Sequence, residues 1–339
     1  MSALSLTTSN KKICLYCGLV FIGDVINCPT DGDKLVSAMV HNSEANMIPE
    51  YHLEQEIGRG GTSTVYRAVR LLDRKVFAVK IMHPWMVSDA AAIARFCREV
   101  ELTARLDSIH TMRAEGYSVL PDGRPYMILE YIEGLTLTAL LRSEQKLHPL
   151  RALPLFIQLA WGLAHCHSIG IVHGDIKPGN ILISDVAGED RVTIADFGIA
   201  TEIGLPSLLA AGETVGSPIY MSPEQCLGRD FDHRSDIYSM GCLMYETLTG
   251  RPAFFAEDPV SIMKMHVYTT AAPLAPSLPQ DCDAEALAAL EKVVLKAISK
   301  RIIDRYNSVQ KLQVDLQKCL LSVCGDGQGP VDQNIRRIA

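Results

Sequence analysis

The chain has 339 residues, of which 48% are apolar, and a formal net charge of −7 at neutral pH. This length and apolar content suffice for a globular protein with two domains or two lobes and a buried core. The net negative charge and the absence of long runs of like charge argue against nucleic acid as a partner. No apolar stretch reaches the roughly 18 residues that a membrane-spanning helix needs.

The N-terminus lacks the charged and then apolar pattern of a secretory signal, which predicts a cytoplasmic protein whose ten cysteines are mostly free thiols. Residues 1–12 are small and polar, and we expect them to form a disordered leader. A short segment that carries cysteines follows at 13–36, and residues 37–50 have the aperiodic composition of a linker.

From Tyr51 the pattern changes to that of β-strands. Three runs rich in β-branched and aromatic residues are separated by turn residues, and they span 51–58, 64–71 and 75–82. This arrangement predicts an antiparallel meander. Residues 89–106 follow with apolar side chains near helical spacing and with Asp89 as a candidate N-cap, and 124–134 returns to a strand pattern.

The remainder of the chain has a mainly helical pattern. The predicted helices span 151–168, 236–249, 284–299 and 308–321. The sequence therefore predicts an α+β protein with a small sheet-rich lobe at 51–133, a larger helical lobe at 134–321 and a tail at 322–339.

Three glycines, Gly58, Gly60 and Gly61, lie between the first two predicted strands. Residues without a Cβ let backbone N–H groups approach phosphate oxygens, although a glycine turn in a hairpin is most often only a turn. Lys80 follows in the third strand and Glu99 in the next helix, where its carboxylate could hold the lysine ammonium against nucleotide phosphates. Each charge alone is more often a solvated surface group, whereas together with the turn they indicate a phosphate site.

Residues 172–180, VHGDIKPGN, place an acid, a base and an amide at fixed offsets, and a second acid follows in the sequence DFG. Asp175 can orient an attacking hydroxyl and accept its proton, and Lys177 can face the phosphate that is transferred. Asn180 and Asp196 offer oxygen ligands to Mg²⁺, a hard cation. Asp and Asn are also common turn residues, but this order and spacing favour phosphoryl transfer.

These motifs, together with FAVK (77–80), GSPIYMSPEQ (216–225) and SDIYSMG (235–241), resemble those of a eukaryotic-type (Hanks-type) serine/threonine protein kinase of the bacterial branch. The resemblance extends from Tyr51 to Leu321. It implies the bilobal protein kinase fold and the transfer of the γ-phosphoryl group of ATP, with Mg²⁺, to Ser or Thr hydroxyls of protein substrates, including the chain itself, in cytoplasmic signalling.

The resemblance also implies roles for further residues. Those of the ATP site are Val65, Ala78, the adenine-binding hinge Glu130 to Ile132, and Leu129 behind the hinge. Those of the activation segment are Thr201, Ser207, Thr214 and Ser217. The residues with scaffold roles are Glu224, Asp236 and Arg305. Ser217 is implied to lie near Asp175 and Lys177. Glu224 is implied to pair with Arg305, and Asp236 to brace the catalytic loop.

Gly174 stands where the family usually has an arginine, which gathers a phosphate on the activation segment and so orders it. One interpretation is that another cation takes its place. The interpretation that we favour is that phosphorylation of the loop is not the main on-switch of this chain.

Two short stretches near the N-terminus, CLYCG (14–18) and CPTDG (28–32), share one form: a ligand, two residues, a second ligand and then glycine. Cys14, Cys17 and Cys28, with Asp31 as the fourth ligand, predict a structural zinc site that resembles a zinc ribbon. The alternative is a pair of turns without a metal. A folded segment here would offer a surface to a protein partner.

Two other classes of function are compatible with this fold. A pseudokinase would bind nucleotide as a scaffold without turnover, and the simultaneous presence of Lys80, Glu99, Asp175, Asn180 and Asp196 argues against it. A small-molecule kinase is disfavoured because GSPIYMSPEQ resembles the peptide-binding stretch of the protein kinases. DIKPGN, with a lysine two residues after the aspartate, resembles the Ser/Thr-specific type.

Overall fold

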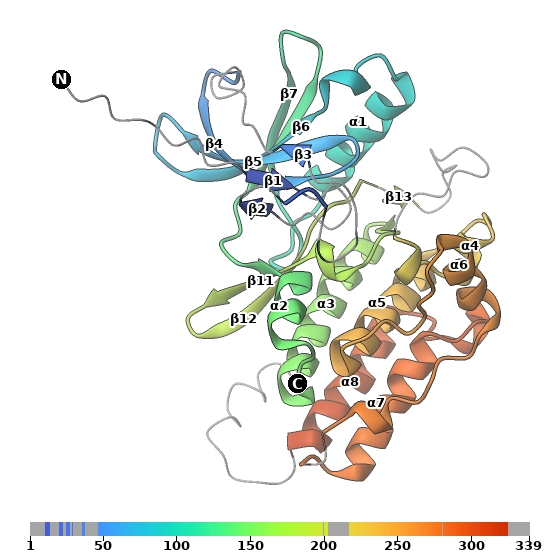
Figure 1. Ribbon diagram of the computed structural model, residues 1–339. Helices are drawn as coiled ribbons and strands as arrows, with labels where there is room; N and C mark the ends of the chain where they lie inside the picture. The colour runs from blue at the N-terminus through green and yellow to red at the C-terminus, as the bar shows by residue number, and fades with distance from the viewer. Residues whose placement is uncertain are drawn as a thin grey trace. The chain divides into compact units, whose positions relative to one another are not determined.

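The computed structural model describes residues 11–13, 20–22, 25–27, 29, 36–37, 47–198, 200–202, 217–279 and 281–324. The chain divides into two compact units, which are Met1–Ala104 with Arg113–Tyr131, and Arg105–Met112 with Ile132–Ala339. We call the first the sheet unit and the second the helical unit (Figure 1). Among the described residues, no helix combines the length and the apolar character needed to traverse a bilayer.

The sheet unit contains a five-stranded antiparallel sheet with the order β4-β5-β6-β8-β7. Its strands are β4 (Tyr51–Arg59), β5 (Ser63–Arg70), β6 (Val76–Met82), β7 (Ala114–Val119) and β8 (Pro125–Glu130). The predicted meander of the first three strands is confirmed. The strand predicted over 124–134 is shorter because its ladder with β6 ends at the pair Phe77 and Glu130.

Helix α1 (Ala90–Ala104) lies in the sheet unit, next to β7 and β8 (Figure 1). The predicted cap is confirmed, because the Asp89 carboxylate accepts the backbone N–H groups of Ala91 and Ala92 at 2.9 and 3.1 Å. Phe96 and Val100 are buried on its inner side. The same side also buries a charged residue, Glu99.

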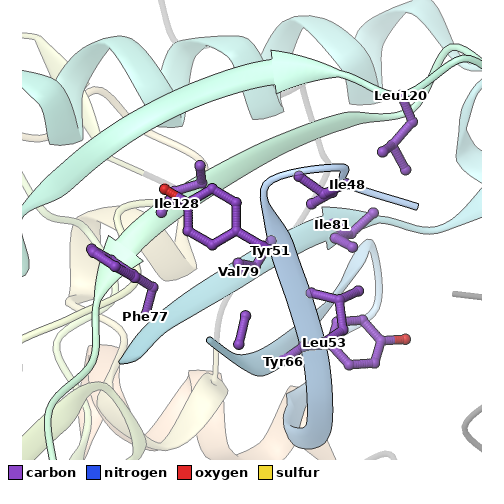
Figure 2. Packing of buried hydrophobic residues seen from close by; sticks show 10 residues of the cluster. Ile48, Tyr51, Leu53, Tyr66, Phe77, Val79, Ile81, Leu120 and Ile128 are labelled. Carbon is purple, nitrogen blue, oxygen red and sulfur yellow. The ribbon is translucent and has the colours of Figure 1, made fainter. Parts of the chain in front are cut away.

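A cluster of buried apolar side chains covers one face of the sheet (Figure 2). Leu53, Tyr66, Val79 and Ile81 come from three adjacent strands. Other members come from the strands as well, and Ile48 and Leu120 come from segments that border the sheet. Each fully buried side chain of this size contributes about 1.5–3 kcal/mol to folding. Because side chains alternate along a strand, placing Val79 and Ile81 on this face puts Lys80 on the other.

A separate three-stranded sheet precedes the main one. It consists of β1 (Lys11–Ile13), β2 (Val20–Ile22) and β3 (Val36–Ser37), with β1 in the middle and antiparallel to both neighbours. The predicted zinc ligands Cys14, Cys17, Cys28 and Asp31 lie outside the described residues.

The helical unit is dominated by helices. They are α2 (Leu137–Glu144), α3 (Pro149–Ser168), α4 (Pro223–Cys226), α5 (His233–Thr249), α6 (Pro259–Tyr268), α7 (Ala284–Ala297) and α8 (Val309–Cys324). Helix α8 lies along α3 and α7, and α5 packs on α3 and α7 (Figure 1). The four predicted helices and the expected α+β architecture are confirmed.

Helix α7 ends two residues earlier and α8 three residues later than predicted. Two other helices start earlier than predicted, and their capping residues explain the difference. Helix α3 begins two residues early because His148 caps it, with Nδ1 accepting the N–H of Leu150 at 3.3 Å. Helix α5 begins at His233 and not at residue 236, since the Asp232 carboxylate accepts the N–H of Arg234 at 2.8 Å.

Short strands complete the helical unit. They are β9 (Leu135–Thr136), β10 (Ile171–Val172), β11 (Ile181–Val186), β12 (Glu189–Ile194) and β13 (Thr201–Glu202). β11 and β12 form a hairpin with β9 at its side, and β10 pairs with β13. The sequence interpretation did not include these strands.

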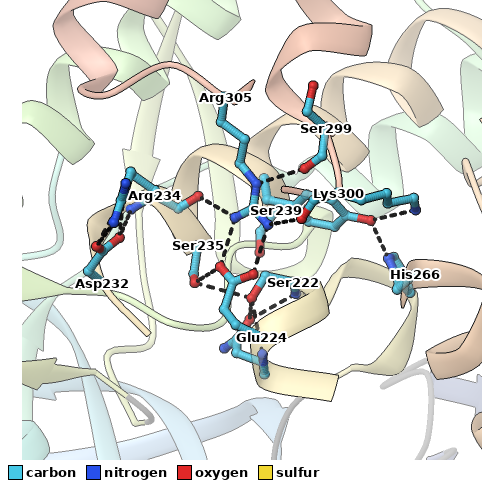
Figure 3. A network of polar contacts seen from close by, with 12 residues as sticks. Ser222, Glu224, Asp232, Arg234, Ser235, Ser239, His266, Ser299, Lys300 and Arg305 are labelled. Carbon is cyan, nitrogen blue, oxygen red and sulfur yellow. Dashed lines mark hydrogen bonds and ion pairs between the residues drawn. The ribbon is translucent and has the colours of Figure 1, made fainter. Parts of the chain in front are cut away.

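A buried ion pair ties α4 to the segment before α8 (Figure 3). The carboxylate of Glu224 accepts two hydrogen bonds from the Arg305 guanidinium, each at 2.7 Å, and the residues are only 5% and 4% exposed. Arg305 also donates to the Ser299 carbonyl at 2.8 Å, and the Ser235 hydroxyl donates to Glu224. Burial alone would raise the pKa of Glu224, but the hydrogen bonds from Arg305 outweigh it and hold that pKa below its usual range.

We expect Glu224→Ala to destabilise the protein strongly, by about 3–5 kcal/mol, because it leaves the Arg305 charge buried without its partner. The matched control is Arg301→Ala, which removes an exposed pair with Asp304 at 3.6 Å and should leave stability nearly unchanged. Urea unfolding followed by circular dichroism measures both. Similar midpoints for the two variants would contradict the scaffold role of the buried pair.

Candidate functional site

A buried ion pair in the sheet unit fixes one cation. Lys80 of β6 and Glu99 of α1 lie with Nζ and Oε1 2.5 Å apart, and the two residues are 9% and 5% exposed. Charges so little exposed are costly unless they are paired. The pair therefore holds the lysine ammonium in one position relative to the sheet.

The register of the sheet shows which residues share the face of Lys80. Val65 on β5 and Met127 on β8 lie directly opposite Lys80, and Leu129 lies opposite Ala78. Directly opposite residues have side chains on the same face. The sheet therefore brings Val65, Ala78, Lys80 and Leu129 together on the face away from the apolar cluster of Figure 2.

Gly58 lies in β4 opposite Val65, and Gly60 and Gly61 lie in the turn between β4 and β5. Gly58, Gly60 and Gly61 are not among the described residues with positive φ. A Cβ at Gly60 would come no closer than 3.8 Å to a described atom, and at Gly61 it would meet none within 4 Å. The open space outside the turn fits a ligand that approaches the backbone closely, as a phosphate does.

The implied hinge is the segment where the sheet unit ends. The division between the units falls between Tyr131 and Ile132. Just before it, Glu130 donates its backbone N–H to the Arg113 carbonyl at 3.0 Å and accepts the Arg113 N–H on its carboxylate at 3.1 Å. These two hydrogen bonds fix the end of β8.

In the helical unit, a carboxylate is held between a cation and an amide. Lys177 Nζ lies 2.6 Å from Asp175 Oδ2, and Asn180 Nδ2 donates to the same oxygen at 3.1 Å and to the Asp175 carbonyl at 2.9 Å. Asp175 and Asn180 are 9% and 5% exposed. Because the amide nitrogen of Asn180 is engaged by Asp175, its amide oxygen is turned away and can serve as a ligand.

The DFG sequence is tied to this group through the backbone. The Ala195 N–H donates to the Asn180 carbonyl at 2.8 Å, and the Ala195 carbonyl lies 3.1 Å from His173 Nε2. The next residue, Asp196, has φ of 62°, a left-handed conformation that aspartate tolerates better than most residues, and it is exposed. Asn180 and Asp196 thus offer hard oxygen atoms, a donor set that suits Mg²⁺.

A second carboxylate holds the loop that leads into Asp175. Asp236 of α5 is fully buried and accepts the backbone N–H groups of His173 and Gly174 at 2.9 and 2.8 Å, and His167 Nε2 lies 2.8 Å from it. Burial alone would raise the pKa of Asp236, but the hydrogen bond from His167 and the neighbouring donors lower it. The carboxylate therefore stays charged and orders the loop.

Two further residues shape this loop and were missed in the sequence. Gln225 Nε2 donates to the Gly174 carbonyl at 2.8 Å, while Gly174 itself has φ of 76°. The second is His167, which is the partner of Asp236. No local pattern reveals either contact, because the partners are 51 and 69 residues apart.

The residues expected on the activation segment are described only in part. Thr201 lies in β13 and pairs with Val172, and Ser217 precedes the 3-10 helix η3 (Pro218–Tyr220). Ser207 and Thr214 lie outside the described residues.

Within the part of the chain that the structure describes, one other group of side chains could hold a metal ion. His148, Asp281 and Cys282 have ligand atoms within 4.8 Å of one another. His148 Nδ1 accepts the N–H of Leu150 at 3.3 Å, and Nε2 faces Asp281 and Cys282. These side chains are exposed or partly exposed, and exposed acidic groups are common without a metal ion, so we assign no metal to this group.

Comparison with known proteins agrees with this geometry. Residues 51–312 match the family described as "Protein kinase domain". "Probable serine/threonine-protein kinase SCO3848" from Streptomyces coelicolor is 37% identical over 283 residues, 82% of this chain and 40% of that protein.

Two further bacterial proteins are similar. "Serine/threonine-protein kinase PknB" from Mycobacterium tuberculosis is 35% identical over 80% of this chain and 43% of its own length. "Serine/threonine-protein kinase pkn3" from Myxococcus xanthus is 34% identical over 79% of this chain and 49% of its own length. The chain thus spans less than half the length of these relatives, and on the family match and these identities it belongs to the protein kinase family.

Proposed function

We propose that this chain is an active serine/threonine protein kinase, which transfers the γ-phosphoryl group of ATP to hydroxyl groups of proteins in the cytoplasm. The observation that carries the proposal is the arrangement of Asp175, which lies 2.6 Å from the Lys177 ammonium and 3.1 Å from the Asn180 amide. A carboxylate held in this way can accept the proton of an attacking hydroxyl, and the ammonium beside it can stabilise the charge of the phosphate.

The roles of the remaining groups follow from their chemistry. Asp175 orients the attacking hydroxyl and accepts its proton, and Lys177 stabilises the negative charge of the phosphoryl group in transfer. Lys80, fixed by Glu99, contacts the phosphates of ATP. Asn180 and Asp196 would hold Mg²⁺, which offsets the charge of the phosphates when bound.

The pseudokinase alternative has no observation in its favour among the described residues. Lys80 is paired with Glu99, and Asp175 is in contact with Asn180. The names of the relatives support serine and threonine as acceptors.

We further propose that phosphorylation of the activation segment is not the main on-switch. Gly174 has no side chain to gather a phosphate, and its carbonyl is held by Gln225. The segment at 218–220 is anchored from α5 without any phosphate, because the Ser239 hydroxyl donates to the Tyr220 carbonyl at 2.7 Å and the Tyr220 hydroxyl donates to Glu246. These contacts support the proposal, because the protein itself holds the described end of the segment at 218–220.

For the N-terminal part of the chain, we propose a zinc-binding segment at 13–36. Its bounds are wider than expected, because β1 begins at Lys11 and β3 ends at Ser37, and the linker ends before Ile48, which is buried in the apolar cluster. The pair Ile13 and Val20 joins β1 to β2 on either side of the stretch that carries Cys14 and Cys17. So few residues cannot build an apolar core of their own, and a structural metal would supply the stability. A segment folded in this way would present its surface to a protein partner.

The first test is Asp175→Asn, which keeps the size of the side chain and removes the proton acceptor. We expect a loss of about 10²–10⁴-fold in kcat for phosphorylation of a generic basic protein with labelled ATP and Mg²⁺, with ATP still bound. The control is Asp185→Asn, an exposed position on β11 that should retain full activity. Equal activity of both variants, or label found only on added metabolites, would reject the proposal.

The second test concerns the activation segment. A double variant, Ser207→Ala with Thr214→Ala, should keep most of the peptide phosphorylation rate, because Gly174 has no side chain that could bind a phosphate placed on either residue. Asp196→Ala provides the inactive reference in the same assay. A collapse of the double variant to the level of this reference would show that loop phosphorylation is the switch.

The third test concerns the metal. Purified protein should contain about one zinc per chain by elemental analysis, and Cys14→Ser with Cys17→Ser should lose it, because tetrahedral zinc requires its thiolate ligands. Cys97→Ser, which changes an exposed cysteine of α1, is the control and should keep the metal. Equal zinc in all three proteins discards the site.

A further inference from the structure

His83 lies directly after β6, beside the glycine turn, and is 4% exposed. Its backbone N–H donates to the Thr62 carbonyl at 2.9 Å, which extends the contact between β5 and β6 past the pair Ser63 and Met82. Pro84 opens the 3-10 helix η1 (Pro84–Met86) immediately after it. The backbone of His83 is therefore held in place on both sides.

The imidazole of His83 contacts the turn on both sides of its tip. Nε2 lies 3.0 Å from the Gly60 carbonyl oxygen, and Nδ1 lies 3.5 Å from the Thr64 hydroxyl. A carbonyl can only accept, so Nε2 carries the proton, and Nδ1 of the neutral ring accepts from Thr64. The Trp85 indole stacks on the ring, with the ring centroids 4.2 Å apart and an interplanar angle of 19°.

The alternation of side chains shows on which face of the sheet this contact lies. Val65 is directly opposite Lys80, so Thr64, its neighbour, points to the other face. The His83 ring meets Thr64 and therefore lies on the face away from Lys80. The Gly60 carbonyl is drawn toward that same face.

The geometry of the peptide bond then fixes the next donor. No cis peptide bond occurs among the described residues, and in a trans peptide the C=O and the following N–H point in opposite directions. With the Gly60 carbonyl directed to His83, the N–H of Gly61 is directed toward the Lys80 face. Gly60 is further fixed because its own N–H donates to the Ser63 carbonyl at 2.9 Å.

We infer that His83 is a positioning residue for nucleotide phosphates: by holding the Gly60 carbonyl, it presents the Gly61 N–H to a phosphate oxygen on the face of Lys80. This role rests on the proposed function, which makes ATP the ligand, and His83 itself touches no nucleotide. Gly60 and Gly61 have no side chains to restrict their backbone, so without this hydrogen bond their peptide can rotate. The donor would then have to be oriented at each binding event, at a cost in affinity.

The test compares two substitutions of similar size. His83→Gln keeps an N–H donor near the position of Nε2, whereas His83→Phe keeps a flat ring beside Trp85 and loses the donor. Binding of a non-hydrolysable ATP analogue with Mg²⁺ and binding of adenosine are measured by calorimetry on the full chain. Adenosine has no phosphates, so it reports the nucleoside part of the site alone.

The expected result is a loss of about three- to tenfold in affinity for the ATP analogue in His83→Phe, the range of one neutral hydrogen bond. Adenosine affinity stays unchanged in both variants, and His83→Gln binds the analogue like the wild type. In steady-state assays, His83→Phe raises KM for ATP, whereas kcat and the KM for the protein substrate stay unchanged.

Two outcomes would overturn the inference: unchanged binding of the analogue by His83→Phe, or a parallel loss of adenosine affinity, which a general structural defect would cause. The binding measurement does not depend on turnover. A wild-type chain that binds the analogue but transfers no phosphate would therefore refute the proposed function. The affinities for the analogue and for adenosine would still decide the role of His83.

Discussion

The fully buried carboxylate of Asp236 is the constraint on which the loop before Asp175, the proposed catalytic residue, depends. It accepts two consecutive backbone N–H groups of the loop and is matched by His167, so one side chain fixes the peptide planes just before Asp175. A charge at such depth is stable only while all of its donors are in place. Any other conformation of the loop would leave this buried charge without its donors, so a single conformation is favoured. Glu224 and Arg305 apply the same principle nearby, where they hold α4 against the segment before α8.

In the sheet unit, the two faces of the five-stranded sheet carry different kinds of side chains. One face is filled by the apolar cluster of Figure 2, while the other carries Lys80, which Glu99 neutralises from α1. Both faces are set by the same alternation of side chains along β6, in which Val79 and Ile81 flank Lys80. Shifting this strand by one residue would exchange the two sets, so the apolar face specifies the position of the cation.

The sequence was sufficient for the parts that local chemistry determines. The runs from Tyr51 onward gave the meander, and Asp89 marked the start of α1, because strand alternation and capping depend on neighbouring residues. It was insufficient where the partner is distant along the chain. The contacts of Asp236 with His167 and of Gln225 with Gly174 have no periodic signature, and the β11–β12 hairpin is too short for its pattern to stand out. The starts of α3 and α5 were missed because His148 is a less usual cap and Asp232 lies before a polar first turn.

The cysteines of the described chain differ in their chemical accessibility. Burial raises the pKa of the Cys242 and Cys226 thiols to about 12 and also raises that of Cys166, so these sulfurs are almost wholly protonated at neutral pH and unreactive. Cys97 is exposed on α1, two residues before Glu99. An alkylating dye would therefore attach to this helix in preference to those three thiols, which offers a selective label on the helix that carries Glu99.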